Sequence, residues 1–153
     1  MVPSPIGPLT LVDEDGVLLR LYLEPPSSQA DVGPRDDTAC AEAAAQLDEY
    51  FTGKREAFDL RLLPLGSDFE LAVWAELTRI PYGETHTYGA VAKAVGEPGG
   101  AQAVGLACGR NPLPLVVPCH RVIGADGSLV GFGGGLPRKR FLLDLEQRES
   151  RLF

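Results

Sequence analysis

The chain has 153 residues, 44% of them apolar, and a formal net charge of −7, which suits one compact domain or two small lobes. No stretch is long and apolar enough to cross a bilayer, and the start, MVPSPIGPLT, does not have the pattern of a signal peptide. Three cysteines without a CxxC pair disfavour a disulfide framework and a cysteine zinc site. We therefore expect a cytoplasmic protein with reduced thiols.

Charge is distributed unevenly between the two halves of the chain. Residues 1–77 carry 5 Lys/Arg and 15 Asp/Glu, whereas residues 78–153 carry 9 and 6. A polyanion such as nucleic acid would therefore meet the second half and avoid the first. An uneven solvated surface explains the same numbers, because the second half is only weakly basic for a nucleic-acid-binding domain.

The first half predicts a small α/β or α+β unit. Two β-rich runs flank Asp15-Gly16, a strong signal for a tight hairpin turn. Turn residues, helical spacing and alternation mark the segments that follow. The predicted elements are a hairpin at 9–24, a loop at 25–37, a helix at 38–53 and a strand at 58–62. No catalytic constellation is apparent among these residues.

The second half begins with a helix start at Ser67. Ser67 and Glu70 fit a capping box, and apolar residues then recur at helical spacing, which places Trp74 in the core. A turn-rich connection at 80–89 leads to two short helices at 87–96 and 101–110, joined by a Gly-rich turn. This pattern fits a helix-turn-helix, although any helical hairpin would look similar.

An apolar run, PLVVPCHRVI, follows these helices and predicts a buried strand or extended segment. After it comes a Gly-rich loop at 124–135. Residues 137–146 then predict a helix that carries Phe141, Leu142 and Leu145 inward.

Cys119-His120 is the one pair with nucleophilic potential. A thiol attacks only as thiolate, and a histidine is the usual group that makes one. Neighbours in a strand point to opposite faces, so adjacency alone does not make a dyad. Pro118 could turn the chain at this point, and Asp144 or Glu146 could orient the histidine. The alternative is a buried structural cysteine beside a surface histidine.

The longer context decides between these interpretations. Residues from about Phe69 to Glu146, with NPLP, PCHRV and the Gly-rich loop, resemble the C-terminal domain of the O6-alkylguanine-DNA alkyltransferases. SPIGPLTLV and GVLLRLYLE resemble the opening of that family's N-terminal, ribonuclease H-like domain. The resemblance implies an α+β fold with domains at 1–66 and 67–153. The first would be a small α/β-type domain with antiparallel strands, and the second a mostly helical domain with a helix-turn-helix.

The resemblance also implies the reaction. Family members flip an alkylated guanine out of duplex DNA and move its O6-alkyl group irreversibly to one of their own cysteines, once per molecule. O4-alkylthymine is expected as a second substrate. The matching catalytic residues are the nucleophile Cys119, its relay His120 and Glu146, the bracing Asn111 and the hydrogen-bond donor Tyr88.

DNA contacts follow from the same resemblance. The family places the helix at 101–110 in the minor groove, where its small residues allow close approach. The expected DNA-binding residues are Tyr88, Ala101, Gln102, Arg110 and Arg121. The expected base pocket consists of Val122, Phe132 and Gly133. No cofactor, metal or membrane is implied, and we expect a monomer.

Two positions depart from the family pattern. Gln102 replaces the arginine that fills the gap left by the flipped base, and Phe132 replaces a tyrosine of the base pocket. Some members bind zinc in the first domain, but this chain has only Cys40 and no histidine there. Two rival functions stay open: an alkylguanine-binding damage sensor with weak or no transfer, and a thiol hydrolase using Cys119 and His120.

Overall fold

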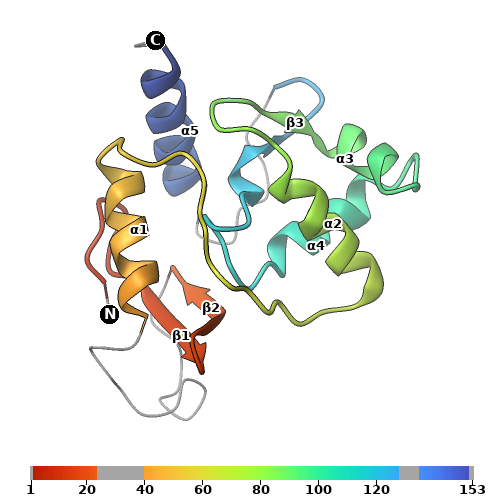
Figure 1. Ribbon diagram of the computed structural model, residues 1–153. Coiled ribbons are helices and arrows are strands. Elements are labelled where there is room, and N and C mark those ends of the chain that lie inside the picture. The colour runs from red at the N-terminus through yellow and green to blue at the C-terminus, as the bar shows by residue number, and fades with distance from the viewer. Residues whose placement is uncertain (1, 24–39, 128–134, 152–153) are drawn as a thin grey trace. The chain divides into compact units, whose positions relative to one another are not determined.

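The protein divides into two compact units, Met1–Leu65 and Gly66–Phe153, in a computed structural model that describes residues 2–23, 40–127 and 135–151 (Figure 1). Both helices and short strands are present, which confirms the predicted α+β class. Among the helices of the described ranges, none has the length and apolar character of a membrane span.

The first unit begins with the predicted hairpin. Strands β1 (Thr10–Glu14) and β2 (Val17–Tyr22) pair antiparallel, with an irregularity between Val12 and Asp13. The turn residues Asp15 and Gly16 have φ values of 53° and 81°. Two consecutive positive φ angles define the type I′ turn, and aspartate followed by glycine adopts them at low cost.

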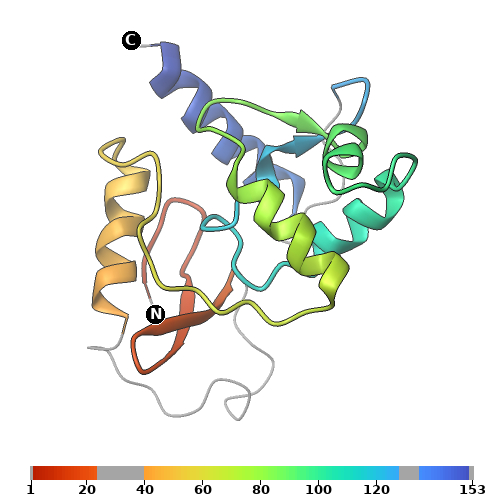
Figure 2. The same cartoon turned by 45° about the vertical axis from the view of Figure 1, so that its right-hand side comes forward.

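Helix α1 (Ala41–Phe51) lies beside this hairpin (Figure 2). Its buried Gln46 makes two hydrogen bonds to the backbone of Asp59. Nε2 donates to the Asp59 carbonyl over 3.0 Å, and Oε1 accepts from the Asp59 N–H over 2.9 Å. The strand predicted at 58–62 is wrong, since this segment forms only a bridge between Leu62 and Leu18. Its backbone groups bond to Gln46 and Leu18 instead of a ladder.

The second unit opens with helix α2 (Asp68–Thr78) and the predicted capping box. The Glu70 N–H donates to Ser67 Oγ over 3.1 Å, and the Ser67 N–H donates to Glu70 Oε1 over 2.9 Å. Trp74 is buried as expected, and its Nε1 donates to the Ala107 carbonyl over 2.9 Å. This bond links α2 to the helix that contains Ala107, which is described next.

Helices α3 (Tyr88–Ala94) and α4 (Ala101–Gly109) form the predicted helix-turn-helix and pack against α2 (Figure 1). Their turn contains Gly96 and Gly99 with φ of 83° and 89°, which glycine adopts without strain. The connection at 80–89 is less irregular than predicted. It contains β3 (His86–Thr87), which pairs in parallel with β4 (Val122–Ile123).

Helix α5 (Leu136–Arg151) ends the chain's described part. Its buried face comprises Lys139, Leu142, Leu143, Leu145 and Glu146. The inward placement of Phe141 is wrong, because its side chain is 38% exposed. At 100° per residue, position 141 lies 160° around the helix axis from Lys139, at the edge of the buried face.

Candidate active site

The turn before Cys119 is braced by Asn111. Its Oδ1 accepts from the Leu113 N–H over 2.9 Å, and its Nδ2 donates to the Val117 carbonyl over 2.8 Å. Leu115, between these contacts, is buried with a φ of 76°. A leucine with positive φ is strained and persists only where its surroundings hold it. The turn is therefore a fixed support for the residues that follow.

Pro118 turns the chain immediately before the cysteine. Its φ of −80° and ψ of 66° are those of an inverse γ-turn, and the Cys119 N–H donates to the Val117 carbonyl over 2.8 Å. Cys119–Arg121 then form one 3-10 turn, η2. The expected extended conformation is thus wrong at the Cys-His pair. The strand rule that would point Cys119 and His120 to opposite faces does not apply there.

Glu146 on α5 receives two side chains from η2. His120 Nε2 lies 2.6 Å from Glu146 Oε2, and Arg121 donates from Nε to Oε1 over 2.8 Å and from Nη2 to Oε2 over 3.0 Å. Burial raises the pKa of the carboxyl, but the bonds and charges of His120 and Arg121 outweigh it and lower the pKa to about 2. Glu146 is therefore an anion at neutral pH.

Arg121 consequently lies inside the second unit, whereas the sequence analysis expected it on the DNA-binding surface. Its side chain is buried, its Nη1 donates to the Ile80 carbonyl over 2.7 Å, and its guanidinium lies 5.7 Å from the Tyr82 ring centroid. A guanidinium engaged in this way on the inside of the unit does not present its donors to DNA. This burial argues against the predicted DNA contact of Arg121, and the nearby carboxylate of Glu146 is the physical reason.

His120 is held with one ring nitrogen available for chemistry. Because the ionised Glu146 accepts from Nε2, we assign the hydrogen to Nε2, which leaves a lone pair on Nδ1. Nδ1 is buried and has no hydrogen-bond partner within the described residues. Burial lowers the His120 pKa, and the charges of Arg121 and Lys139 lower it further, against the opposing effect of Glu146. A neutral ring can accept a proton at Nδ1.

Cys119 is buried and free of any disulfide. Burial raises its pKa to about 11, while a hydrogen bond from the Asn111 side chain and the charge of Lys139 act in the opposite direction. The cysteine therefore rests as a thiol at neutral pH. Thiolate formation requires an acceptor for its proton and nearby groups that stabilise the anion.

Tyr88 reaches this cluster through the β3–β4 pairing. Thr87 ends β3 and caps α3, its Oγ1 accepting from the Ala90 N–H over 3.0 Å, so Tyr88 begins the helix. Because His86 pairs in parallel with Val122, the start of α3 lies beside β4, the strand that directly follows η2. Burial, followed by the charges of the Cys108 and Cys119 thiolates, raises the Tyr88 pKa to about 12. The phenol therefore stays protonated as a donor.

Lys139 is a member of the cluster that our sequence analysis missed. It is completely buried, with its Nζ 3.4 Å from Tyr88 Oη. One signal could have revealed it: Lys139 precedes Glu146 by seven residues, which places both on one face of a helix. From sequence alone, lysine and glutamate at that spacing indicate a solvent-exposed helix face, unless that face is already known to be buried.

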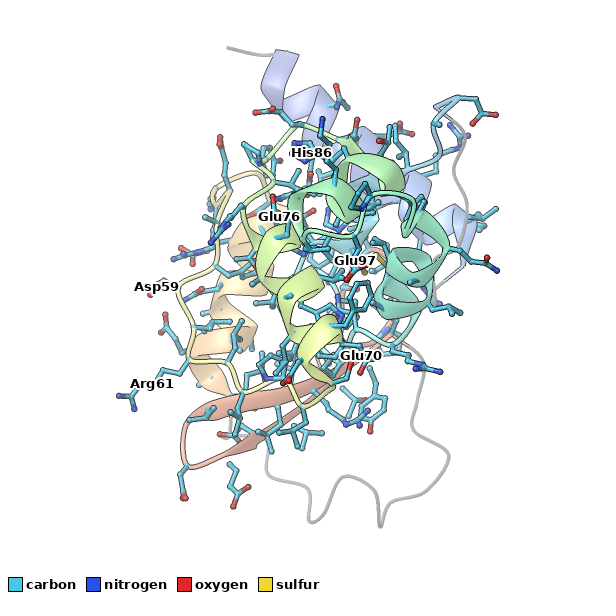
Figure 3. All side chains as sticks on the ribbon, turned by 90° about the vertical axis from the view of Figure 1, so that its right-hand side faces the viewer. Asp59, Arg61, Glu70, Glu76, His86 and Glu97 are labelled. Carbon is cyan, nitrogen blue, oxygen red and sulfur yellow. The ribbon has the colours of Figure 1, made fainter. Side chains whose placement is uncertain are left out.

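The remaining predicted residues lie on the surface, in the core or outside the described ranges. Ala101 is half-buried and Gln102 exposed in the first turn of α4. Arg110 is exposed after that helix, its Nη1 3.7 Å from Oε2 of Glu70, which Figure 3 labels at the start of α2. Val122 is fully buried in β4. Phe132 and Gly133 lie outside the residues that the structure describes.

Family models match both units. The 6-O-methylguanine DNA methyltransferase ribonuclease-like domain matches residues 1–64, and the DNA-binding domain of the same family matches residues 68–148. Together the two matches span nearly the whole chain.

Relatives match over the same length. A methylated-DNA–protein-cysteine methyltransferase of Mycolicibacterium paratuberculosis is 51% identical and covers 97% of this chain and 92% of its own. One from Methanosarcina barkeri is 45% identical, covering 99% and 98%. The crystal structure of Mycobacterium tuberculosis OGT in complex with DNA superposes with a TM-score of 0.92 at 49% identity, over 97% of this chain and 91% of that one. The cysteine-centred cluster thus stands in a chain that belongs to the 6-O-methylguanine DNA methyltransferase family.

Proposed function

We propose that this protein repairs alkylated DNA by moving the O6-alkyl group of guanine to Cys119, once per molecule. The observation that carries the proposal is the buried cluster of Cys119, His120 and Glu146, in which Nδ1 of the histidine is unsatisfied among the described residues. Relatives at 45–51% identity carry the name of this activity. O4-alkylthymine presents a similar alkyl–oxygen bond and is a second proposed substrate.

The first step is proton removal from the thiol. Cys119 passes its proton to His120 Nδ1, directly or through one water, and the resulting imidazolium donates from Nε2 to Glu146. The ionised carboxylate stabilises that cation, while Arg121 fixes the carboxylate with two bonds. This is base catalysis by a histidine oriented by a carboxylate.

The second step is displacement at the alkyl carbon. Sγ of Cys119 forms the S–C bond while the C–O6 bond breaks and its electron pair goes to guanine. Tyr88, protonated at neutral pH, donates its hydroxyl hydrogen to the departing base, and the proton that His120 took from the thiol then returns through solvent to Tyr88. The products are S-alkylcysteine and unmodified guanine. A thioether is a poor leaving group, so the alkyl group stays on Cys119 and each molecule acts once.

The DNA partner is bound by the helix-turn-helix. We place the exposed first turn of α4, with Ala101 and Gln102, in the minor groove and Arg110 near the phosphates. The damaged base leaves the stack to reach Cys119, and its pocket consists of Val122, Phe132 and Gly133. The protein acts as a monomer.

The test is incubation with duplex DNA carrying O6-methylguanine with a labelled methyl group. Wild-type protein should take up one methyl per molecule, and mass spectrometry should locate it on Cys119. Cys119→Ser should retain DNA binding and take up none, because a serine without a strong base is a poor nucleophile. Cys40→Ser is the matched control and should behave as wild type.

Two results would refute the proposal. Label that stays on tightly bound DNA would make the protein a damage sensor, and label that appears in solution with turnover would make it a hydrolase. Methyl found on Cys108 in place of Cys119 would overturn the assignment of the nucleophile.

A further inference from the structure

Lys139 is buried in the second unit, where an ammonium group loses its hydration and must be stabilised by other groups. Its side chain is 0% exposed, although lysine is almost never fully buried unless it is paired. Its Nζ lies 3.4 Å from Tyr88 Oη and 5.6 Å from the centroid of the same ring. The geometry therefore joins the residue to Tyr88, whose hydroxyl is the proposed donor to the departing base.

Titratable groups from three other elements face Lys139. They are Tyr88 of α3, Cys108 of α4, and Cys119 and His120 of η2. Burial lowers the pKa of Lys139, whereas thiolates at Cys119 and Cys108 raise it. By the same interaction, Lys139 lowers the pKa of both thiols. An ammonium at this position thus favours the thiolate form of the nucleophile.

The bond to Tyr88 fixes the direction of its hydroxyl. A lysine ammonium has three hydrogens to donate and no lone pair to accept with. Tyr88 Oη must therefore accept from Nζ, and its own hydrogen points away from Lys139. A hydroxyl that accepts from a cation is also a stronger donor, because the two bonds polarise each other.

We propose that Lys139 is a positioning residue of alkyl transfer, whose ammonium stabilises the attacking Cys119 thiolate and holds the Tyr88 hydroxyl as a donor to the departing guanine. The inference rests on the proposed function. During transfer the negative charge moves from Sγ to guanine as the S–C bond forms and the C–O6 bond breaks. Lys139 keeps its proton throughout, and one cation serves both ends of the charge movement.

The first test needs no DNA. The rate at which iodoacetamide alkylates Cys119, followed by mass spectrometry across pH, reports the thiolate fraction. Lys139→Met should shift the midpoint upward by about one pH unit or more, since the loss of a nearby opposite charge changes a pKa by that amount. Lys139→Arg should restore most of the shift. Arg140→Met removes an exposed charge from the same helix and should leave the midpoint unchanged.

The second test is single-turnover transfer from O6-methylguanine duplex. Lys139→Met should slow transfer at neutral pH by about tenfold or more, with the loss shrinking as pH rises toward the new midpoint. DNA affinity should stay at the wild-type value. In a Tyr88→Phe background, the same substitution should cost less than in wild type, because part of its effect acts through the hydroxyl.

A folded Lys139→Met protein with the wild-type alkylation midpoint would overturn the inference. If the variant does not fold, the wild-type protein still decides. The Lys139 Nζ resonance should respond over the pH range in which Cys119 titrates, and Cys119→Ser should abolish that response. An unchanged response in Cys119→Ser would overturn the inference. Since thiol reactivity is measured without DNA, its outcome is separate from whether the protein transfers alkyl groups at all.

Discussion

The two units bury polar side chains in opposite ways. Among the described residues, the first unit's buried polar group is Gln46, a neutral amide bonded on both sides to the backbone of Asp59. In the described part of the second unit, four ionisable side chains are buried around Cys119: His120, Arg121, Lys139 and Glu146.

The difference shows where the fold gives up stability for chemistry. Removing an ion from water costs several kcal/mol, and its partner's attraction often does no more than offset that cost. An amide that meets a backbone N–H and C=O, as Gln46 does, needs no such compensation. The first unit thus follows the rules of a stable core, whereas the second accepts buried charge where a thiol must become an anion.

The largest expected effect comes from breaking the charged cluster at its centre. Glu146→Gln leaves the Arg121 guanidinium buried without its anion and should lower the free energy of unfolding by about 3–5 kcal/mol. The imidazolium of His120 also loses its stabiliser, so single-turnover transfer should slow by about a hundredfold. Chemical denaturation and quenched transfer assays measure the two effects.

Asp144→Asn is the matched control for this change. It removes the same charge from an exposed position of the same helix and should leave both measurements near wild type. A Glu146→Gln protein that loses DNA affinity but keeps its transfer rate would show that the carboxylate is only structural.

The next effect is a dependence of stability on pH. The Glu146 pKa is about 2 in the folded protein and about 4.3 in an unfolded chain. A lowered pKa means that the stabilisation is complete above pH ~4.3 and is lost as pH falls toward 2, for a total of about 3 kcal/mol. Denaturation from pH 7 to 2 should show the wild type and Glu146→Gln converging in this window, whereas Asp144→Asn keeps the wild-type slope.

His120 should add to this acid sensitivity. Its pKa is lowered by burial in the folded state, so the unfolded chain binds a proton first as pH falls through about 6.5. Stability should therefore begin to decline near that pH, before the Glu146 window opens. A flat stability profile between pH 7 and 5 would contradict the buried neutral histidine.

A smaller effect is expected in the first unit. Gln46→Leu leaves the N–H and carbonyl of Asp59 without their partner and should lower the unfolding free energy by about 1–3 kcal/mol. Transfer should be unchanged under conditions where the protein is folded. Asp59→Ala is the control, because it keeps both backbone bonds and trims an exposed side chain, labelled in Figure 3. Slower transfer by folded Gln46→Leu would show that the units are coupled.

The smallest effect should follow from adding a charge outside the second unit's core. Gln102→Arg, on the exposed first turn of α4, should strengthen duplex binding and speed transfer from duplex by about tenfold or less, because arginine can occupy the gap of the flipped base. The salt dependence should steepen by roughly one phosphate contact.

Comparing substrates separates gap filling from simple charge. A single strand has no orphaned partner base, so Gln102→Arg should help there much less than on duplex. An equal gain on both would be plain electrostatics. No gain on either would mean that α4 does not enter the groove.

Several elements were determined by the sequence alone, because their signals are local. Asp15-Gly16 specifies a tight hairpin, Ser67 and Glu70 specify a helix start, and the glycines between α3 and α4 mark the turn of the helix pair. In each case the residues that carry the signal also make the contacts, within a few positions of one another. Cys119-His120 belongs to this group as a pair, although its local conformation does not.

Tertiary structure alone decided how the buried charges are paired. Residue types alone left Asp144 and Glu146 as equal candidates before the family resemblance matched Glu146, and the burial of one face of α5 leaves the first exposed and the second bonded to His120. Arg121 was expected to contact DNA because of its place in the motif, but it bonds to Glu146, 25 residues away in the sequence. Lys139 bonds to Tyr88, 51 residues away. Such pairings depend on which faces the packing of α5 and η2 removes from water, because a charge must find a partner only once it is buried.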